Sequence, residues 1–231
     1  MTGAAKRIGR EIALALSALG FDIALHYHES LKEARETAQE IKQDGNRCEL
    51  FPFDLSRENG LREFFRHTAK KFPHLSLLIN SASIFEKSRV ISSDADSFNR
   101  HLNINFKAPL VLSREFARFC RQGQIINILD THITDNKTAY FDYLLSKKLL
   151  TEFTKMAAVE FAPNIRVNAI APGLILPPKK ESNSYLSRLA RQIPLKRKGT
   201  VDSIAQTVSF LINNDYVTGQ IIYVDGGEHL L

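Results

Sequence analysis

The 231-residue chain has no tryptophan, only two cysteines and no apolar run that approaches the length of about 18 residues needed to cross a membrane. Cys48 and Cys120 form no Cys-x-x-Cys pair, which argues against a disulfide framework or a zinc site and predicts free thiols in a reducing compartment. Residues 1–4 lack the charged start and apolar core of a secretion signal. The sequence therefore predicts a cytoplasmic protein with no membrane partner.

Positive charge exceeds negative charge, with 31 Lys and Arg residues against 25 Asp and Glu residues and a net charge of +6. The basic residues are spread along the chain, and the groups at 179–180 and 196–198 are short. No nucleic-acid-binding motif accompanies them, so we predict no nucleic-acid partner. A locally basic site for a small anionic ligand accounts for the excess.

Apolar residues recur alternately with helical and with strand-like spacing. A first helical face runs from Ile8 to Leu19 and ends at Gly20, and Ser30 to Glu33 reads as a capping box for a second helix. Strands separated by helices indicate right-handed βαβ units, and hence one α/β domain over 1–231 with a doubly wound parallel sheet. Strands are predicted at 23–25, 50–53, 75–79, 125–129, 166–171 and 221–224, and further helices at 57–72, at 98–119 with an interruption at Pro109, and at 140–161.

Residues 2–9, Thr-Gly-Ala-Ala-Lys-Arg-Ile-Gly, stand directly before the first helix. Small residues at such an entrance let the backbone approach a pyrophosphate, to which the helix N-terminus presents free N–H groups. A central strand normally precedes this kind of loop, and here that first strand is absent from the chain. We expect either another segment in its place or a less stable sheet.

Tyr143 and Lys147 are four residues apart, which places both side chains on one face of the helix at 140–161. A phenol has an ordinary pKa of about 10, and a neighbouring ammonium group favours its ionised form. The spacing therefore predicts that Lys147 lowers the pKa of Tyr143, which then exchanges a proton during a reaction. The pair His26 and His28 has no further ligand nearby in the sequence, so no metal site is predicted.

The Tyr–Lys pair belongs to an ordered series that also contains residues 2–9, 54–55, 80–83, Asn105, Asp130, 172–173 and 225–227. In order and spacing this series resembles the short-chain dehydrogenase/reductase family over essentially the whole chain. The resemblance implies a Rossmann-like fold, a substrate loop at about 174–194, and a homotetramer built on the helices at 98–119 and 140–161.

Within that family, the details are similar to pteridine reductases and dihydromonapterin reductases. Arg7 stands where most relatives have a second glycine, and residues 25–28 read Leu-His-Tyr-His. Asp130 occupies the place of the usual catalytic serine, and Phe85 that of an aromatic residue that stacks on a pterin. The resemblance implies NADPH-dependent reduction of a dihydropterin, such as dihydromonapterin, dihydrobiopterin or dihydrofolate. Core packing for Phe85 and a turn carboxylate for Asp130 are the alternative interpretations.

The resemblance also assigns roles to individual residues. Catalysis falls to Asp130, Tyr143, Lys147 and Asn105, with Asn105 supporting a proton-relay water and the proton coming from Tyr143 or Asp130. Substrate binding falls to Ser83, Phe85, Asp130 and Tyr143. The cofactor NADP(H) would contact Gly3, Arg7, Ile8, His26, Tyr27, His28, Ser30, Asp54, Leu55, Asn80, Ala82, Ser83, Tyr143, Lys147, Pro172 and Gly173.

The choice between NADP and NAD depends on the end of the strand at 23–25. NAD-preferring enzymes place an acidic residue there, whereas this chain has none before Glu29. Arg7, His28 and Ser30 suit a 2′-phosphate, so NADP is favoured, although Glu29 stands where the resemblance leads us to expect arginine.

Two other functions stay open. A carbonyl reductase of the same family would act on a ketone or a 3-oxoacyl thioester. A protein of another class, a non-catalytic NADP-binding regulator, would bind the cofactor without turnover.

Overall fold

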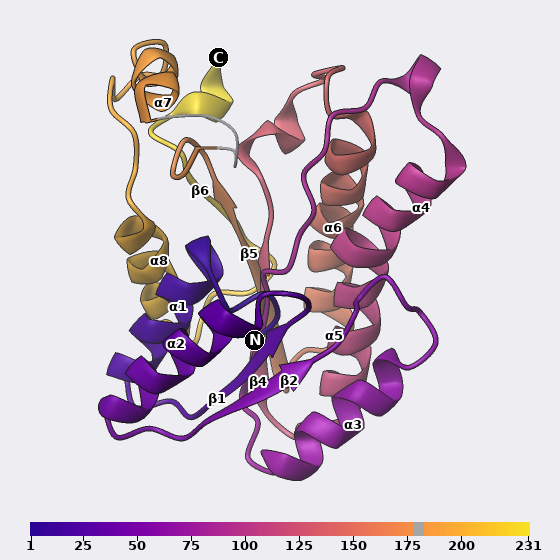
Figure 1. Cartoon of the computed structure of the whole chain (residues 1–231), viewed down its shortest axis with the longest axis vertical. Helices are drawn as coiled ribbons and strands as arrows, with labels where there is room; N and C mark the ends of the chain where they lie inside the picture. The colour runs from indigo at the N-terminus through magenta and orange to yellow at the C-terminus, as the bar shows by residue number, and fades with distance from the viewer. Residues whose placement is uncertain (178–182) are drawn as a thin grey trace.

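The computed structural model describes residues 1–177 and 183–231, in which parallel strands lie between two layers of helices (Figure 1). Each strand pairs in parallel with its neighbours. The predicted α/β class and doubly wound parallel sheet are confirmed. The two-stranded part contains β1 (Ile23–Tyr27) and β2 (Cys48–Pro52), and the four-stranded part contains β3 (Leu77–Asn80), β4 (Gly123–Ile128), β5 (Ile165–Pro172) and β6 (Ile221–Val224) in that order.

Two hydrophobic clusters bind the helices to opposite faces of the sheet. One contains buried residues of α1 (Arg7–Ala18), α2 (Leu31–Gln43) and α8 (Val201–Asn213). The other contains buried residues of α3 (Leu61–Lys71), α5 (Ala108–Phe119) and α6 (Phe141–Glu160). The shorter helices α4 (Ala95–Leu102) and α7 (Asn183–Ala190) project beyond the carboxyl ends of the strands (Figure 1). No helix in the described ranges is long and apolar enough to cross a membrane.

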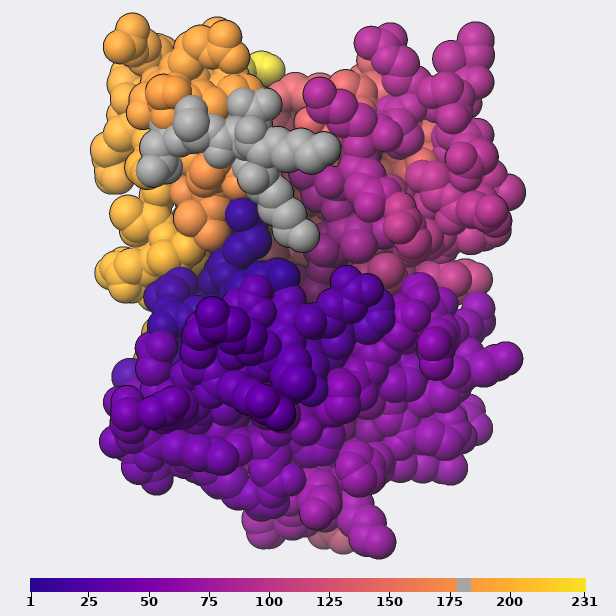
Figure 2. All heavy atoms as spheres, in the orientation of Figure 1, coloured from indigo at the N-terminus to yellow at the C-terminus, as the bar shows by residue number. Residues whose placement is uncertain are grey.

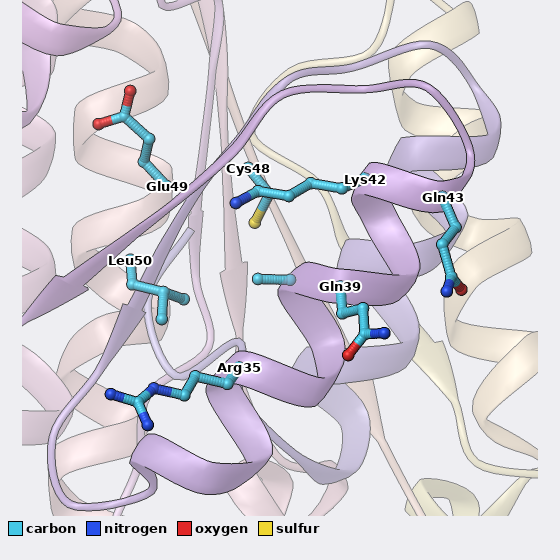
Figure 3. A pocket seen from close by; sticks show the side chains of 8 residues that line it. Arg35, Gln39, Lys42, Gln43, Cys48, Glu49 and Leu50 are labelled. Atoms are coloured by element: carbon cyan, nitrogen blue, oxygen red, sulfur yellow. The ribbon is translucent and has the colours of Figure 1, made fainter.

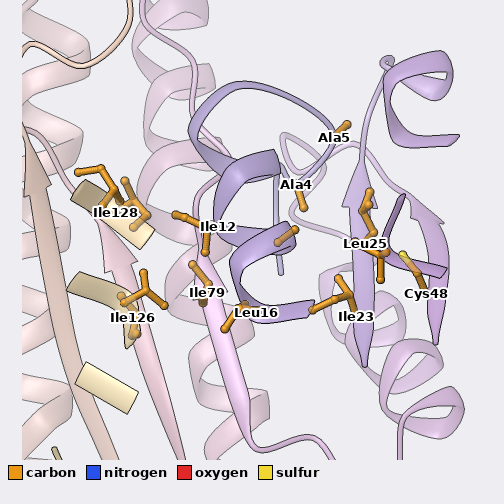
Figure 4. Close-up of a cluster of buried hydrophobic side chains, with 14 of the residues drawn as sticks. Ala4, Ala5, Ile12, Leu16, Ile23, Leu25, Cys48, Ile79, Ile126 and Ile128 are labelled. Carbon is orange, nitrogen blue, oxygen red and sulfur yellow. The ribbon is translucent and has the colours of Figure 1, made fainter. Parts of the chain in front are cut away.

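Met1 and Thr2 occupy the position between β1 and β3. The Thr2 N–H donates to the carbonyl of Ile79, and the His26 N–H donates to the carbonyl of Met1. This short connection joins the two parts of the sheet at their carboxyl ends. Below it, Leu16 of α1 lies between Ile79 and Ile23 in the same hydrophobic cluster (Figure 4). Met1 and Ala4 add bonds to the carbonyls of Ala24 and His26, so backbone hydrogen bonds of residues 1–4 and side chains of α1 take the place of a full first strand.

Most predicted boundaries agree with the structure within a few residues, and four differences have local causes. The predicted capping box is wrong, because the Ser30 side chain contacts Lys6 and not the backbone of α2. Leu19 lies beyond the end of α1 and is 47% exposed. The predicted helix at 98–119 is divided into α4, a π-helical turn (Asn103–Lys107) and α5, whose first turn contains Pro109. Helix α8 was not predicted.

Candidate active site

The predicted site residues gather at the edge where the parallel strands end. In Figure 2, the α7 region (orange) lies on one side of this edge and the segment that leads to α4 (magenta) on the other. The amino-terminal residues (indigo) lie below them. Residues 178–182 of the predicted substrate loop at 174–194, with Lys179, Lys180 and Ser182, lie outside the described ranges.

Three predicted catalytic residues meet at the end of β4. Tyr143 and Lys147 are buried on α6, only 6% and 2% exposed. The Tyr143 hydroxyl donates to Oδ2 of Asp130 at 2.7 Å, and the Lys147 ammonium donates to the carbonyl of Ile128 at 2.8 Å. The other oxygen of Asp130 accepts from the backbone N–H of His132 at 2.9 Å, so the carboxylate has a fixed direction.

The electrostatics of this group differ from the prediction made from spacing. Burial, followed by the Asp130 carboxylate, raises the pKa of Tyr143 well above 10.0. The prediction that Lys147 lowers this pKa is wrong, because the Lys147 ammonium is held by Ile128 and lies 5.8 Å from the centroid of the Tyr143 ring. Burial lowers the pKa of Lys147 to about 8, against the opposing charge of Asp130. Tyr143 is therefore a protonated hydrogen-bond donor at neutral pH.

Asn105 lies in the π-helical turn and is completely buried. Its amide oxygen accepts from the Ile84 N–H at 3.0 Å and from the Ser83 hydroxyl at 3.2 Å. Its amide nitrogen donates to the Ile84 carbonyl and to the Ser146 hydroxyl, both at 3.1 Å. All four hydrogen bonds of the amide are in use. The side chain therefore positions the segment around Ser83, and a water would have to bind the backbone instead.

The glycine-rich entrance forms a cradle for an anion. Gly3 has φ 63°, and a Cβ atom added there would lie 2.7 Å from Cα of Ala82. A Cβ atom on Gly9 would lie 2.1 Å from the carbonyl oxygen of Gly3. Helix α1 has no side-chain cap and no acidic residue in its first turn, where Ile8 lies. Uncapped N–H groups beside a loop of small residues fit a pyrophosphate.

Two adjacent cations of the entrance point to different partners. Arg7, at φ 58°, donates to the carbonyl of Pro177 at 2.8 Å, next to the predicted substrate loop. Lys6 contacts the Ser30 hydroxyl at the start of α2. The sequence analysis assigned Arg7 and Ser30 to one 2′-phosphate site and did not include Lys6. The presence of a second cation in the entrance could have identified Lys6.

The end of β1 carries the residues predicted to surround the cofactor's adenosine half. His26 is buried, accepting from the Gly3 N–H at Nδ1 (3.1 Å) and contacting the Phe53 carbonyl through Nε2 (3.0 Å). His28 is exposed, with Nε2 4.0 Å from Oδ2 of Asp54. Tyr27 is half-buried, Leu55 is buried, and Glu29 is exposed. His26 thus supports the entrance through its bond to Gly3, while His28 and Glu29 are exposed to solvent.

The segment after β3 lies opposite the entrance. Asn80 donates to Oδ1 of Asn127 at 2.8 Å, and the Ala82 N–H donates to the Thr2 hydroxyl at 3.1 Å. Phe85 stacks on Tyr140 with ring centroids 4.3 Å apart and lies edge-on to Tyr143 at 4.7 Å. Because Phe85 is 45% exposed, it is not a core residue. It forms an aromatic wall beside the Tyr143 hydroxyl.

The segment after β5 packs against the turn that follows β6. A Cβ atom on Gly173 would lie 2.5 Å from Cβ of Asp225, and Pro172 is buried. Asp225 accepts from the Thr131 hydroxyl and from the backbone and ring of His229, both at 2.8 Å. This network connects the residue after Asp130 to the end of the chain, and sequence reasoning did not identify Thr131 or His229.

A separate hollow lies away from these residues. About 640 Å³ opens between α2 and β2, lined by residues that include Arg35, Lys42 and Cys48 (Figure 3). It contains no predicted site residue, and since Cys48 begins β2, it lies toward the amino ends of the strands. Burial raises the pKa of Cys48 to about 11, so the thiol is protonated. The described ranges contain no group of three metal-ligating side chains.

A parallel sheet with an anion cradle at its carboxyl edge, beside a buried Tyr–Lys pair and a half-buried Asp, is typical of a nucleotide-dependent oxidoreductase. The family model described as enoyl-(acyl carrier protein) reductase matches residues 3–229. The chain belongs to the short-chain dehydrogenase/reductase family, as its motifs had indicated.

Individual relatives divide between two activities. The 3-oxoacyl-[acyl-carrier-protein] reductase FabG of Staphylococcus epidermidis is 30% identical, covering 100% of this chain and 98% of the relative. The FabG of Buchnera aphidicola is 32% identical, covering 100% and 96%. Among solved structures, the FolM alternative dihydrofolate reductase 1 of Brucella canis, complexed with NADP, is 33% identical with a TM-score of 0.92 and covers 100% of this chain and 93% of its own. The Brucella suis protein, also with NADP, has 33% identity, a TM-score of 0.94 and coverage of 100% and 94%.

Proposed function

We propose that this chain is an NADPH-dependent pteridine reductase that converts a dihydropterin to a tetrahydropterin. The observation that carries the proposal is the Asp130 carboxylate, oriented by His132 and bonded to the Tyr143 hydroxyl at 2.7 Å. A carboxylate accepts hydrogen bonds from N–H groups, which a pterin ring has and a ketone lacks. The similarity to two dihydrofolate reductases supports the same substrate class.

NADP(H) fits the residues at the entrance. The cradle of Gly3 and Gly9 receives the pyrophosphate, and Lys6, His28 and Ser30 supply a cation and polar groups for a 2′-phosphate at the end of β1. The exposed Glu29 carboxylate remains in solvent at the start of α2, where the helix dipole favours a negative charge. The similar structures that contain NADP or NADPH support this preference.

The chain's own residues then orient the substrate and deliver a proton. When bound, NADPH supplies the hydride that goes to the carbon of a C=N bond. The Tyr143 hydroxyl donates to Asp130 in the structure, so to deliver its proton to the ring nitrogen it would have to turn from Asp130 to the substrate. Asp130 holds the phenol in place, and Lys147 lies one helical turn away to bind a ribose hydroxyl. Phe85 offers a ring face against which the flat substrate stacks.

The carbonyl reductase is the second candidate, because the curated relatives named above are 3-oxoacyl reductases. The two functions make different demands on Asp130. A ketone oxygen needs only a donor, which the Tyr143 hydroxyl supplies, whereas the N–H groups of a pterin need an acceptor, which the Asp130 carboxyl group supplies. Purified protein should oxidise one NADPH for each tetrahydropterin formed, and Asp130→Ala should abolish this reaction. Pterin turnover that survives in Asp130→Ala would contradict the proposal.

We also propose a homotetramer. Helix α6 exposes Leu149, Met156 and Val159, which are 38%, 70% and 81% exposed in the single chain. An apolar row of this kind on a helix that covers the sheet suits burial against a second copy. Light scattering coupled to size-exclusion chromatography tests this, with four chains per particle expected and a monomer contradicting it.

A further inference from the structure

Glu228 lies close to the active site and has an oxygen without a partner. It begins the short 3₁₀ helix (Glu228–Leu230) after the Gly226-Gly227 turn. Its Oε2 atom is buried and forms no hydrogen bond within the described part of the chain. The carboxyl group as a whole is only 14% exposed.

The neighbouring carboxyl group provides a contrast. Asp225, three residues earlier, accepts hydrogen bonds at both oxygens, from the Gly227 N–H at 2.9 Å and from Thr131 and His229. That carboxylate holds the turn together and has no capacity left for a ligand. Glu228 plays no comparable part in the turn, because its contact with His132 is an ion-pair distance of 3.6 Å from Oε1 to Nε2.

The position of Glu228 is fixed by two elements of the site. A Cβ atom on Gly173 would lie 2.9 Å from Oε2, so this oxygen packs against the backbone just after β5. On the other side, the His132 ring faces Oε1, and the His132 backbone N–H donates to Asp130. Glu228 therefore stands next to the segment that carries Asp130 and against Gly173, a predicted cofactor contact.

A buried oxygen without a partner costs free energy unless a ligand satisfies it. Burial raises the pKa of Glu228 and makes its ionisation unfavourable. The charges of His132 and Lys137 lower this pKa, and those of Asp130 and Asp225 raise it. A ligand that donates a hydrogen bond to Oε2 lowers the free energy of this buried oxygen, whereas an anionic or acceptor-only ligand raises it.

We propose that Glu228 is a second substrate-binding carboxyl group, which accepts a hydrogen bond from an N–H group of the pterin ring and so selects nitrogen heterocycles over ketones. This inference rests on the proposed function. The pterin would then meet two carboxyl groups, those of Asp130 and Glu228, both of which contact His132.

The test compares Glu228→Gln with His132→Asn and with Glu152→Gln, which alters an exposed carboxylate on α6. Glu228→Gln replaces an acceptor oxygen of this group with an amide donor, so it should raise the KM for 7,8-dihydropterin at least about tenfold. The KM for NADPH should stay within about twofold, which also verifies folding. Glu152→Gln should not change the dihydropterin KM by more than about twofold. His132→Asn, which alters a neighbour of Glu228, should raise this KM less than Glu228→Gln does.

A smaller rise in Glu228→Gln, or an equal rise in His132→Asn, overturns the inference, because Glu228 would then be inert or would act only through His132. Dihydropterin binding to the protein saturated with NADP⁺, measured by fluorescence titration, should weaken in parallel with the KM. If the wild-type protein reduces no dihydropterin, the proposed function itself fails. If it does so and Glu228→Gln is unchanged, only the present inference fails.

Discussion

The hydroxyl of Tyr143 on α6 donates to the carboxylate of Asp130 after β4 at 2.7 Å, although the two residues are 13 positions apart in the chain. Both groups are oriented by the backbone, Asp130 through its hydrogen bond from His132 and Tyr143 through its place in a 20-residue helix. Because the two side chains act as a unit, a change at either one should alter both proton delivery and substrate choice.

Replacing Asp130 with serine should reverse the substrate preference. Asp130→Ser removes the acceptor for ring N–H groups and supplies a hydroxyl that donates to a ketone oxygen. We expect dihydropterin kcat/KM to fall by about 100-fold or more, in the range lost with one positioned catalytic group, while acetoacetyl-thioester reduction is retained or rises. Steady-state kinetics with both substrates measure the ratio, and an unchanged ratio would show that Asp130 does not select the substrate.

Replacing Tyr143 with phenylalanine should separate chemistry from cofactor binding. The change removes one hydroxyl from a buried ring and leaves the entrance untouched. We expect kcat for dihydropterin to fall by about 10²–10⁴-fold, as for loss of a general acid. The NADPH dissociation constant, measured by fluorescence, should stay within about twofold. Near-normal turnover in Tyr143→Phe would assign proton delivery to another group.

Replacing Gly9 with alanine should impair cofactor binding. The added methyl group would lie 2.1 Å from the Gly3 carbonyl oxygen, so the entrance must move. Because a displacement of about 1 Å at a binding site has effects on the order of 100-fold, we expect a rise of this size in the NADPH dissociation constant. Gly45→Ala is the control for lost stability alone, because at φ 90° it strains a turn that lies far from the entrance in the sequence, where the added Cβ atom touches nothing. Equal NADPH affinity in both variants would contradict the assignment of the cradle.

The buried His26 should make stability depend on pH below neutrality. Burial lowers the pKa of His26 from 6.5 to about 4, with further lowering from the charges of the chain's amino group and His28, against the Phe53 carbonyl. Because the unfolded chain binds this proton more readily than the folded chain, the stabilisation is complete above pH 6.5 and is lost as the pH falls toward 4. The shift corresponds to roughly 3 kcal/mol.

Urea unfolding at pH 7 and at pH 5 measures this dependence. His26→Gln should be less stable than the wild-type protein at pH 7 and should lose less of its stability on acidification. His74→Gln, an exposed histidine at the end of α3, should behave as the wild-type protein does. If His26→Gln retains the full pH dependence, other groups account for it.

Local patterns predicted the fold class, and the family resemblance proposed the site residues that the structure brings together. Helical spacing alone brings Tyr143 and Lys147 to one face, and order along the chain places Asp130 at a strand end. The direction of the Tyr143 pKa shift was mispredicted, because it depends on burial and on which group the ammonium contacts, and neither is encoded in a four-residue spacing. Ser30 looked like a helix cap because the sequence does not show that Lys6, 24 residues earlier, reaches its hydroxyl. Glu228 gave no signal, since its unpartnered oxygen arises only where the turn after β6 meets Gly173.

The central claim is tested most directly by NADPH oxidation with the purified protein, assayed side by side with dihydrobiopterin, dihydromonapterin, dihydrofolate and an acetoacetyl thioester. The arrangement of Asp130, Tyr143 and Phe85 predicts that at least one dihydropterin is reduced with a kcat/KM well above that of the thioester. Reduction of the thioester alone would contradict it and would identify a carbonyl reductase on the same scaffold.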